Sequence, residues 1–330
     1  MKKNFNMRYC FFVLLISFIA ISCTSVGKNT ISIRLKWLFF SNYSGAVVAK
    51  EKGFFPAHWS VEVRQGGFEA NPITMVESGS DDFGITSALE LLRARAQGIK
   101  IVALCADFQK SPVSFITLAS SNIKKIEDFP GHRIGIKYGT NTELMYKVLL
   151  KRAGVDQNSV TTIPMKFSTL PLVGKQVDVY PSYYMTDPVN LESQGIPVTT
   201  INPDEYGVEC YGNILFTHEN TIREKPYIVR EFVAAYVRGW KWAIEHPEET
   251  GEIFANLNEA TSAKNQVEIL KRTQTFLLVE GTMDRFGAME EKKWLSTLDI
   301  SQEDPGFNTL PNAKTLNIRD CYTNDFLLTK

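Results

Sequence analysis

The chain has 330 residues, with 36 basic and 36 acidic side chains and 44% hydrophobic residues. A chain of this length can bury one large core or two modest ones. The balanced charge argues against a nucleic-acid-binding protein, which usually needs a clustered basic surface.

The N-terminus carries the pattern of an export signal. Three basic residues precede a mostly apolar run from Tyr9 to Ser22, too short to span a bilayer, and no second run is long enough to do so. Cys23 follows this run directly, and the sequence Ala-Ile-Ser-Cys at residues 20–23 resembles a bacterial lipoprotein cleavage site. We therefore expect residues 1–22 to be a signal peptide, residues 23–30 a tether, and Cys23 the acylated residue. The alternative is an uncleaved anchor.

Cleavage would leave 33 basic and 36 acidic residues, a net charge of −3. Apart from the anchor Cys23, the cysteines then remaining are Cys105, Cys210 and Cys321, an odd and widely spaced set that forms neither a disulfide framework nor a zinc pattern. One disulfide stays open as an alternative. We expect no metal, no cofactor and no reactive thiol.

Short apolar runs alternate with helical patterns over the first two thirds of the chain. Strands are expected at 31–35, 61–64, 82–85, 101–106, 115–118, 133–136, 160–163 and 177–180, and helices at 44–52, 87–97 and 142–153. Such alternation predicts an α/β architecture with largely parallel sheets.

The last third is helical. An apolar stripe at spacings of three and four begins near Tyr227, and further helices are expected from Glu248, over 265–280 and over 290–298. Two α/β series followed by helices predict two lobes with a cleft between them.

The domain division follows from this series. We expect residues 31–110 plus 214–330 to form lobe one and residues 111–213 to form lobe two. Segments 115–118 and 211–216 would be the crossovers, about which the lobes would close by a hinge motion.

Two strand-to-helix junctions offer helix N-termini to a ligand. Thr86 or Ser87 would cap the helix after one strand, and Thr140 with Glu143 has the spacing of a capping box. Such junctions most often only cap the helix. The two junctions, one in each lobe, could however face each other across a cleft and bind a ligand. Gly139 would let the backbone approach that ligand closely.

Aromatic residues gather at predicted strand ends, with Trp37 after the first strand and Tyr183 and Tyr184 among prolines and hydroxyl residues. Core packing is the usual role of such rings, and rings at strand ends also suit stacking on a flat ligand. The sequence holds no HExxH, CxxC or phosphate loop, and no histidine stands in a nucleophile motif. Nothing supports an enzyme.

Several stretches together resemble bacterial pyrimidine-precursor-binding proteins of thiamine-salvage ABC importers, which are related to thiamine pyrimidine synthases. They cover residues 31–327 in order: Trp37, Asn42, Gly45, Ala49, Gly53, Phe54, Asp82–Ile85, Ala94, Arg95, Gly98, Gln109, Pro112, Gly135–Glu143, Asp204–Gly212, Arg238–Trp240, His246, Pro247 and Tyr322–Phe326. The wider superfamily includes alkanesulfonate and nitrate binders. The resemblance implies a two-lobed periplasmic-binding-protein type II fold with the ligand cleft between the lobes.

The opening motif departs from the family pattern. A proline, an asparagine and a histidine have become Phe39, Phe40 and Tyr43, and Asp187 stands where glutamate is usual. The missing histidine and the absence of a cysteine-rich motif argue against a synthase. Rings in place of polar groups favour a larger or more apolar aromatic ligand, such as a flavin.

We therefore expect a lipid-anchored solute-binding protein that captures a small heteroaromatic solute. A thiamine-precursor pyrimidine comes first, with riboflavin or an alkanesulfonate or nitrate as alternatives. Its partners would be an ABC permease and, through the lipid, the membrane, and the protein would be a monomer. The expected ligand-binding residues are Trp37, Asn42, Tyr43, Asp82, Gln109, Tyr138, Gly139, Thr140, Tyr183, Tyr184, Asp187 and Tyr211.

Overall fold

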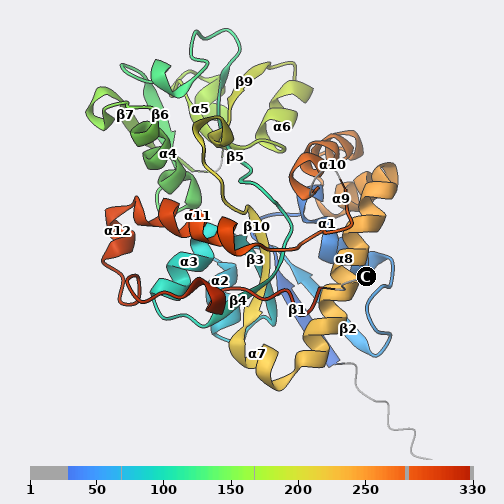
Figure 1. The fold of residues 1–330 in the computed structure, drawn as a ribbon. Helices are drawn as coiled ribbons and strands as arrows, with labels where there is room; N and C mark the ends of the chain where they lie inside the picture. The colour runs from blue at the N-terminus through green and yellow to red at the C-terminus, as the bar shows by residue number, and fades with distance from the viewer. Residues whose placement is uncertain (1–28, 68, 167, 279–281, 328–330) are drawn as a thin grey trace, which may run out of the picture.

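The computed structural model describes residues 29–67, 69–166, 168–278 and 282–327, which fold into two α/β lobes (Figure 1). The predicted signal peptide, most of the tether and Cys23 lie outside the described residues. The predicted two-lobed α/β fold is confirmed. In Figure 1 the lobe drawn mainly in green lies above the blue and cyan sheet of the other.

Lobe one is built on a five-stranded sheet in the order β2-β1-β3-β10-β4. Its strands are β1 (Asn29–Arg34), β2 (Trp59–Arg64), β3 (Phe83–Ser87), β4 (Ile101–Ala106) and β10 (Asn213–His218). β1 pairs in parallel with β2 and β3, as the alternation with helices predicts. β10 is antiparallel to β3 and β4, because it returns from the other lobe.

Helices cover both faces of this sheet. They are α1 (Ser44–Glu51), α2 (Pro72–Glu77), α3 (Ala88–Ala96), α7 (Glu219–Glu224), α8 (Pro226–Glu245), α9 (Pro247–Leu257), α10 (Ala263–Leu277), α11 (Glu291–Gln302) and α12 (Pro305–Asn308). The apolar stripe of α8 packs with α1 on one side of the sheet, and α3 packs with α11 on the other. None of the helices in the described ranges has the length and apolar character to cross a membrane.

The second lobe contains two smaller sheets, β8-β5-β9 and β6-β7. Its elements are β5 (Val113–Leu118), β6 (Arg133–Ile136), α4 (Asn141–Arg152), β7 (Thr161–Pro164), α5 (Leu170–Val173), β8 (Tyr180–Tyr183), α6 (Asp187–Ser193) and β9 (Val198–Ile201). β6 and β7 are parallel, whereas β5 is antiparallel to both of its neighbours. The prediction of largely parallel sheets is therefore wrong for this part.

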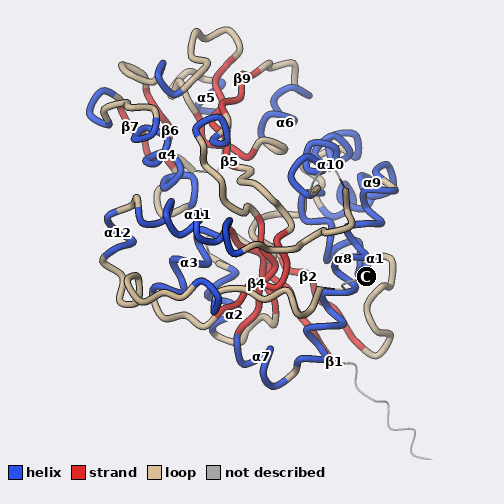
Figure 2. Tube along the Cα trace, in the orientation of Figure 1, coloured by secondary structure: helices blue, strands red, loops and turns tan. Residues whose placement is uncertain are grey.

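The two connections between the lobes differ from the expected ones. Of the expected crossovers, segment 115–118 lies within buried β5 and most of segment 211–216 within β10. The chain crosses instead at about 107–112 and 202–212, which Figure 2 shows as tan segments between the lobes. They run side by side, since Gly212 N donates to Phe108 O at 2.9 Å. The exact domain boundaries remain a prediction.

Candidate functional site

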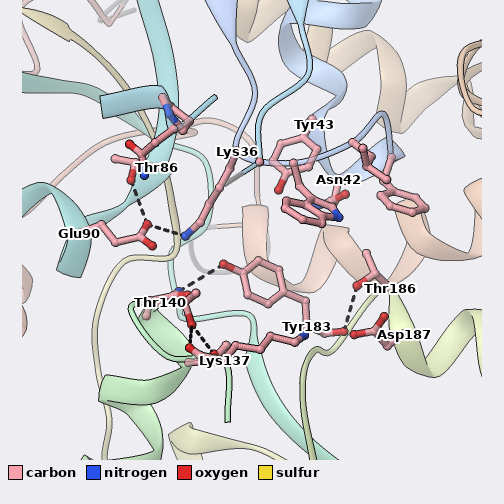
Figure 3. A pocket seen from close by; sticks show the side chains of 18 of the residues that line it. Lys36, Asn42, Tyr43, Thr86, Glu90, Lys137, Thr140, Tyr183, Thr186 and Asp187 are labelled. Carbon is pink, nitrogen blue, oxygen red and sulfur yellow. Dashed lines mark hydrogen bonds and ion pairs between the residues drawn. The ribbon is translucent and has the colours of Figure 1, made fainter. Parts of the chain in front are cut away.

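A cavity of about 350 Å³ lies between the lobes (Figure 3). We call its lobe-one side the first wall, formed by Lys36, Trp37, Leu38, Phe40, Asn42, Tyr43, Gly67, Asn71, Pro72, Thr86 and Glu90. The second wall, from the other lobe, consists of Lys137, Gly139, Thr140, Asn141, Thr142, Tyr180, Tyr183, Thr186 and Asp187. Seven of the expected ligand-binding residues are among these.

The first wall contains an ion pair between two of its own residues, Lys36 and Glu90. Lys36 follows β1, and its Nζ lies 2.6 Å from Oε2 of Glu90 on α3. The same Glu90 completes a capping box with Ser87, whose hydroxyl accepts from Glu90 N at 3.3 Å. Burial opposes both charges, but their mutual attraction outweighs it, so the pKa of Lys36 is raised and that of Glu90 is lowered.

The N-terminus of α3 therefore offers little to a ligand. Its predicted cap, Ser87, is in place, but Glu90 reaches back to accept from the Ser87 amide at 3.2 Å and from the Thr86 hydroxyl at 3.0 Å. The groups expected to face the ligand are thus largely satisfied within the protein.

The first wall also carries rings and one open acceptor. A 3-10 turn at Ser41–Tyr43 places Asn42 and Tyr43 beside Trp37 and Phe40 in the cavity lining. Asn42 is 1% exposed, and within the described structure its Oδ1 is buried without a hydrogen-bond partner. An unsatisfied buried acceptor costs free energy, so this oxygen would gain from any donor that reached it.

The N-terminus of α4 meets the cavity without a side-chain cap. Thr140 stands at the N-cap position, but its hydroxyl donates to Lys137 O at 2.6 Å instead. Glu143, which the capping-box spacing assigned to the N-cap amide, accepts from Gly139 N at 2.8 Å. The predicted capping box is therefore wrong, because the tight turn at Gly139, φ +76°, moves the contact by one residue.

Two charged groups of the second wall have pKa values shifted toward the neutral form. Lys137 is 5% exposed and donates to Pro181 O at 2.8 Å. Burial lowers the pKa of Lys137 to about 8, although Asp187 opposes the shift. Burial likewise raises the pKa of Asp187, opposed by Lys137 and by a hydrogen bond from Ser182.

Tyr183 links the two walls. Its ring lies at the end of β8, and its hydroxyl accepts from Asn141 Nδ2 at 3.2 Å. Nζ of Lys36 lies 5.9 Å from the centroid of the same ring (Figure 3). Close to this ring, burial and, to a smaller extent, Tyr183 raise the pKa of the Tyr43 hydroxyl, so the Tyr43 phenol stays neutral.

Two expected site residues, Asp82 and Gln109, serve the fold rather than the cavity. The Asp82 carboxylate accepts from Ser32 N at 2.8 Å and so ties β3 to β1. Nε2 of Gln109 donates to Ala106 O at 3.0 Å and to Ala288 O at 3.3 Å. Neither residue lines the cavity.

Three expected tyrosines also lie outside the cavity lining. Tyr138 is 50% exposed, and its hydroxyl contacts Thr162 Oγ1 at 3.2 Å. Tyr184 lines a smaller cavity of about 240 Å³ beside the connecting segments. Tyr211 is buried in the core, where its hydroxyl accepts from Glu290 N at 2.7 Å.

A family model described as NMT1/THI5 like matches residues 41–250. The chain belongs to the NMT1/THI5-like family. The matched range includes both walls of the cavity except the segment before residue 41. The resemblance drawn from the opening and later motifs is thereby confirmed.

Members of this family and its relatives carry different names. The chain is 26% identical to riboflavin-binding protein RibY of Chloroflexus aurantiacus over 292 residues, covering 85% of this chain and 81% of the relative. It is 24% identical to a formylaminopyrimidine-binding protein of Halalkalibacterium halodurans (86% and 89% covered). A 4-amino-5-hydroxymethyl-2-methylpyrimidine phosphate synthase of Legionella pneumophila is 23% identical (91% and 93% covered).

Solved structures place the NMT1/THI5-like chain in a known fold. The periplasmic aliphatic sulphonate binding protein SsuA of Escherichia coli superposes with a TM-score of 0.69 at 14% identity, covering 88% of this chain and 91% of that one. At this identity the likeness shows the fold, which is that of periplasmic binding proteins.

Sequence reasoning found Asp187 but missed the other three charged side chains among the described lining residues. Lys36, Glu90 and Lys137 look like surface residues in the sequence, because lysine and glutamate side chains usually face solvent. One signal was available: Ser87 followed three residues later by Glu90 has capping-box spacing, which fixes Glu90 at the start of the helix.

Proposed function

We propose that this protein is the solute-binding component of an ABC-type importer and binds its solute in the cavity between the lobes. The fold shared with a sulphonate binding protein supports this, as do the relatives named for binding riboflavin and formylaminopyrimidine. An ABC permease would be the partner that receives the solute from a monomeric binding protein.

The solute we propose is a small neutral heteroaromatic ring with an N–H donor, of the class of thiamine-precursor pyrimidines. The observation that carries this is the buried Oδ1 of Asn42, which has no hydrogen-bond partner among the described residues and belongs to a residue of a ring-lined cavity. Trp37, Tyr43 and Tyr183 supply faces on which a flat ring can stack. Asp187 in the second wall can accept from an amino group or ring N–H.

The size of the cavity favours a compact ligand. Its volume of about 350 Å³ lies near the lower end of the range of about 300–1,000 Å³ that is usual for small-molecule sites. A single substituted pyrimidine suits this volume better than a three-ring system.

Riboflavin is the second candidate. Phe40 and Tyr43 line the cavity at two positions where the family pattern has asparagine and histidine, so the wall is more apolar than that pattern. Leu38 is 38% exposed at the lining and would let a longer ligand extend toward solvent.

Catalysis and the binding of a simple anion have less support. Cys105, Cys210 and Cys321 are buried away from the cavity, and burial raises the pKa of the Cys210 thiol to about 12, so these cysteines are unsuited to the chemistry of a synthase. No arginine is among the described lining residues, and Lys36 is already paired with Glu90, which disfavours a sulfonate or nitrate.

The sequence also supports an anchor. We propose that Cys23 is acylated after removal of residues 1–22 and holds the protein at the extracytoplasmic face of a membrane. Mass spectrometry of the purified protein tests this, since acylation would add lipid mass to an N-terminal peptide beginning at Cys23. An unmodified Cys23 would contradict it.

Isothermal titration of the purified full-length protein tests the solute. We expect 4-amino-5-hydroxymethyl-2-methylpyrimidine or its formylated amine to bind with one site per chain and to raise the melting temperature. Riboflavin binding without pyrimidine binding would select the second candidate. If neither ring binds, the proposed function is wrong.

A further inference from the structure

The Glu90 carboxylate is held by several donors at the edge of the cavity (Figure 3). Its Oε2 accepts from Lys36 Nζ at 2.6 Å, from Thr86 Oγ1 at 3.0 Å and from Ser87 Oγ at 2.8 Å. The lysine and glutamate side chains are only 16% and 25% exposed. A carboxylate with this many donors stays ionised and stays in place.

The ion pair with Glu90 neutralises Lys36, the cation that is best placed to contact an anionic ligand. Lys36 follows β1 immediately before Trp37, and its Nζ lies near Tyr183, so the amine stands between the two walls. Because Glu90 occupies this amine, an anionic ligand would have to approach a carboxylate in order to reach it.

The second wall does not restore a positive charge. It contributes one lysine, Lys137, and one carboxylate, Asp187. Lys137 is already engaged with Pro181 O. The described lining therefore holds two cationic and two acidic side chains and presents no net positive charge to an anion.

We propose that Glu90 is a specificity residue, which makes this cavity select neutral rings over anionic rings of the same shape by holding Lys36 in an ion pair. The inference rests on the proposed function, because it concerns ligands of the same cavity. It deepens that function by excluding the charged, for example carboxylated or phosphorylated, forms of the ring.

Glu90→Gln tests the proposal in the full-length protein. Glutamine can still serve at the third position of a capping box, so α3 keeps its cap while Lys36 loses its counter-charge. Glu291→Gln is the matched control, because Glu291 pairs with Arg319 at 3.0 Å on the surface and away from the cavity. The double variant Lys36→Gln/Glu90→Gln removes both charges.

Two matched pairs of probes serve for the titrations. The first pair is 4-amino-5-hydroxymethyl-2-methylpyrimidine and 4-amino-2-methylpyrimidine-5-carboxylate, and the second is riboflavin and its monophosphate. In Glu90→Gln we expect the affinity for the anionic member, relative to that for the neutral member, to gain on the order of tenfold. The gain should be absent from Glu291→Gln and should disappear in the double variant.

Three results would overturn the inference. They are an unchanged preference in Glu90→Gln, an equal gain in Glu291→Gln, and a gain that survives in the double variant. All three, with neutral rings still bound by the wild type, leave the proposed function intact. If the wild type and all variants bind no ring, the proposed function fails and the inference falls with it.

Discussion

The two walls of the cavity differ in how their polar and charged groups are satisfied. In the first wall, the N-terminus of α3 is closed by a full capping box, and Lys36 is paired with Glu90. In the second wall, the N-terminus of α4 has no side-chain cap, and burial shifts the pKa of both Lys137 and Asp187 toward the neutral form.

This difference separates a preorganised wall from an adaptable one. A paired and capped wall keeps its geometry whether or not a ligand is present, and in the described lining Asn42 Oδ1 is a buried acceptor without a partner. A wall with an uncapped helix N-terminus and charges that burial disfavours has more to gain from a ligand. Four predictions can break or sharpen this contrast, beginning with the largest expected effect on binding.

Removing the ring of Trp37 should weaken binding most. Trp37→Ala takes away a stacking face of the first wall, and we expect the affinity for the ring solute to fall by about 100-fold. Trp242→Ala is the control, since Trp242 stacks on His246 with centroids 4.2 Å apart, outside the cavity. Titration calorimetry measures both, and equal losses would show that the cavity is not the site.

Breaking the ion pair of the first wall should reduce stability. Lys36→Met leaves the partly buried Glu90 carboxylate without its cation, and we expect the free energy of unfolding to fall by about 2 kcal/mol. Lys151→Met should change it by less than about 0.5 kcal/mol, because Lys151 is a 67% exposed partner of Glu303. Urea unfolding checks both, and a neutral Lys36→Met would mean that the first wall is not held by this pair.

Removing the buried acceptor Asn42 Oδ1 should weaken ligand binding and leave the stability of the protein nearly unchanged. In Asn42→Leu we expect about tenfold weaker binding of a ring with an N–H donor, since the ligand donor is left unpaired. The stability of the unbound protein should change little, because the substitution removes a buried oxygen without a partner together with the hydrogen bond between Asn42 and Tyr43. Calorimetric titration and thermal unfolding of the same variant test this, and a fall in stability with unchanged affinity would assign Asn42 to the fold instead.

Lys137 of the second wall should make the free energy of unfolding depend on pH. The pKa of Lys137 is about 8 in the folded state against 10.5 for an ordinary lysine, so between these values the unfolded state binds more protons and the contribution of Lys137 to stability rises with pH. Lys137→Met should remove this rise, by about 1–3 kcal/mol between pH 8 and 10. Lys151→Met, a change at an exposed position of α4, should keep it.

Urea midpoints of the wild type and both variants over this pH range provide the measurement. The raised pKa of Lys36 has the opposite sign, since its contribution is fully present below its unfolded value. A wild type and a Lys137→Met variant with the same pH dependence would contradict the contrast between the walls.

Much of the fold could be predicted from the sequence where apolar patterns are strong. The buried runs at β4 and β6 have the predicted bounds, and α3 ends before Gly98 as expected. The short strand β9, VTTI, escapes prediction because its threonines give no clear alternation. The segment expected as the second crossover is largely β10. This strand was not predicted, because its own residues do not indicate which strands it pairs with after the chain returns from the other lobe.

The site could be predicted only in part, for a physical reason. Trp37 and Tyr183 stand at strand ends, which are positions that sequence patterns can locate. The ring of Tyr211 stands equally close to a strand but is turned into the core against Trp294, with centroids 5.7 Å apart. Which side of the backbone a ring takes depends on helices far away in the chain, and sequence patterns do not contain this information.

The most direct test of the account is a crystal structure of the protein with the neutral ring that binds most tightly. We predict that the ring lies between the two walls, stacked on Trp37, with one of its N–H groups within hydrogen-bond distance of Asn42 Oδ1. A ring bound elsewhere, or one that leaves Asn42 Oδ1 without a ligand donor, would contradict the central claim.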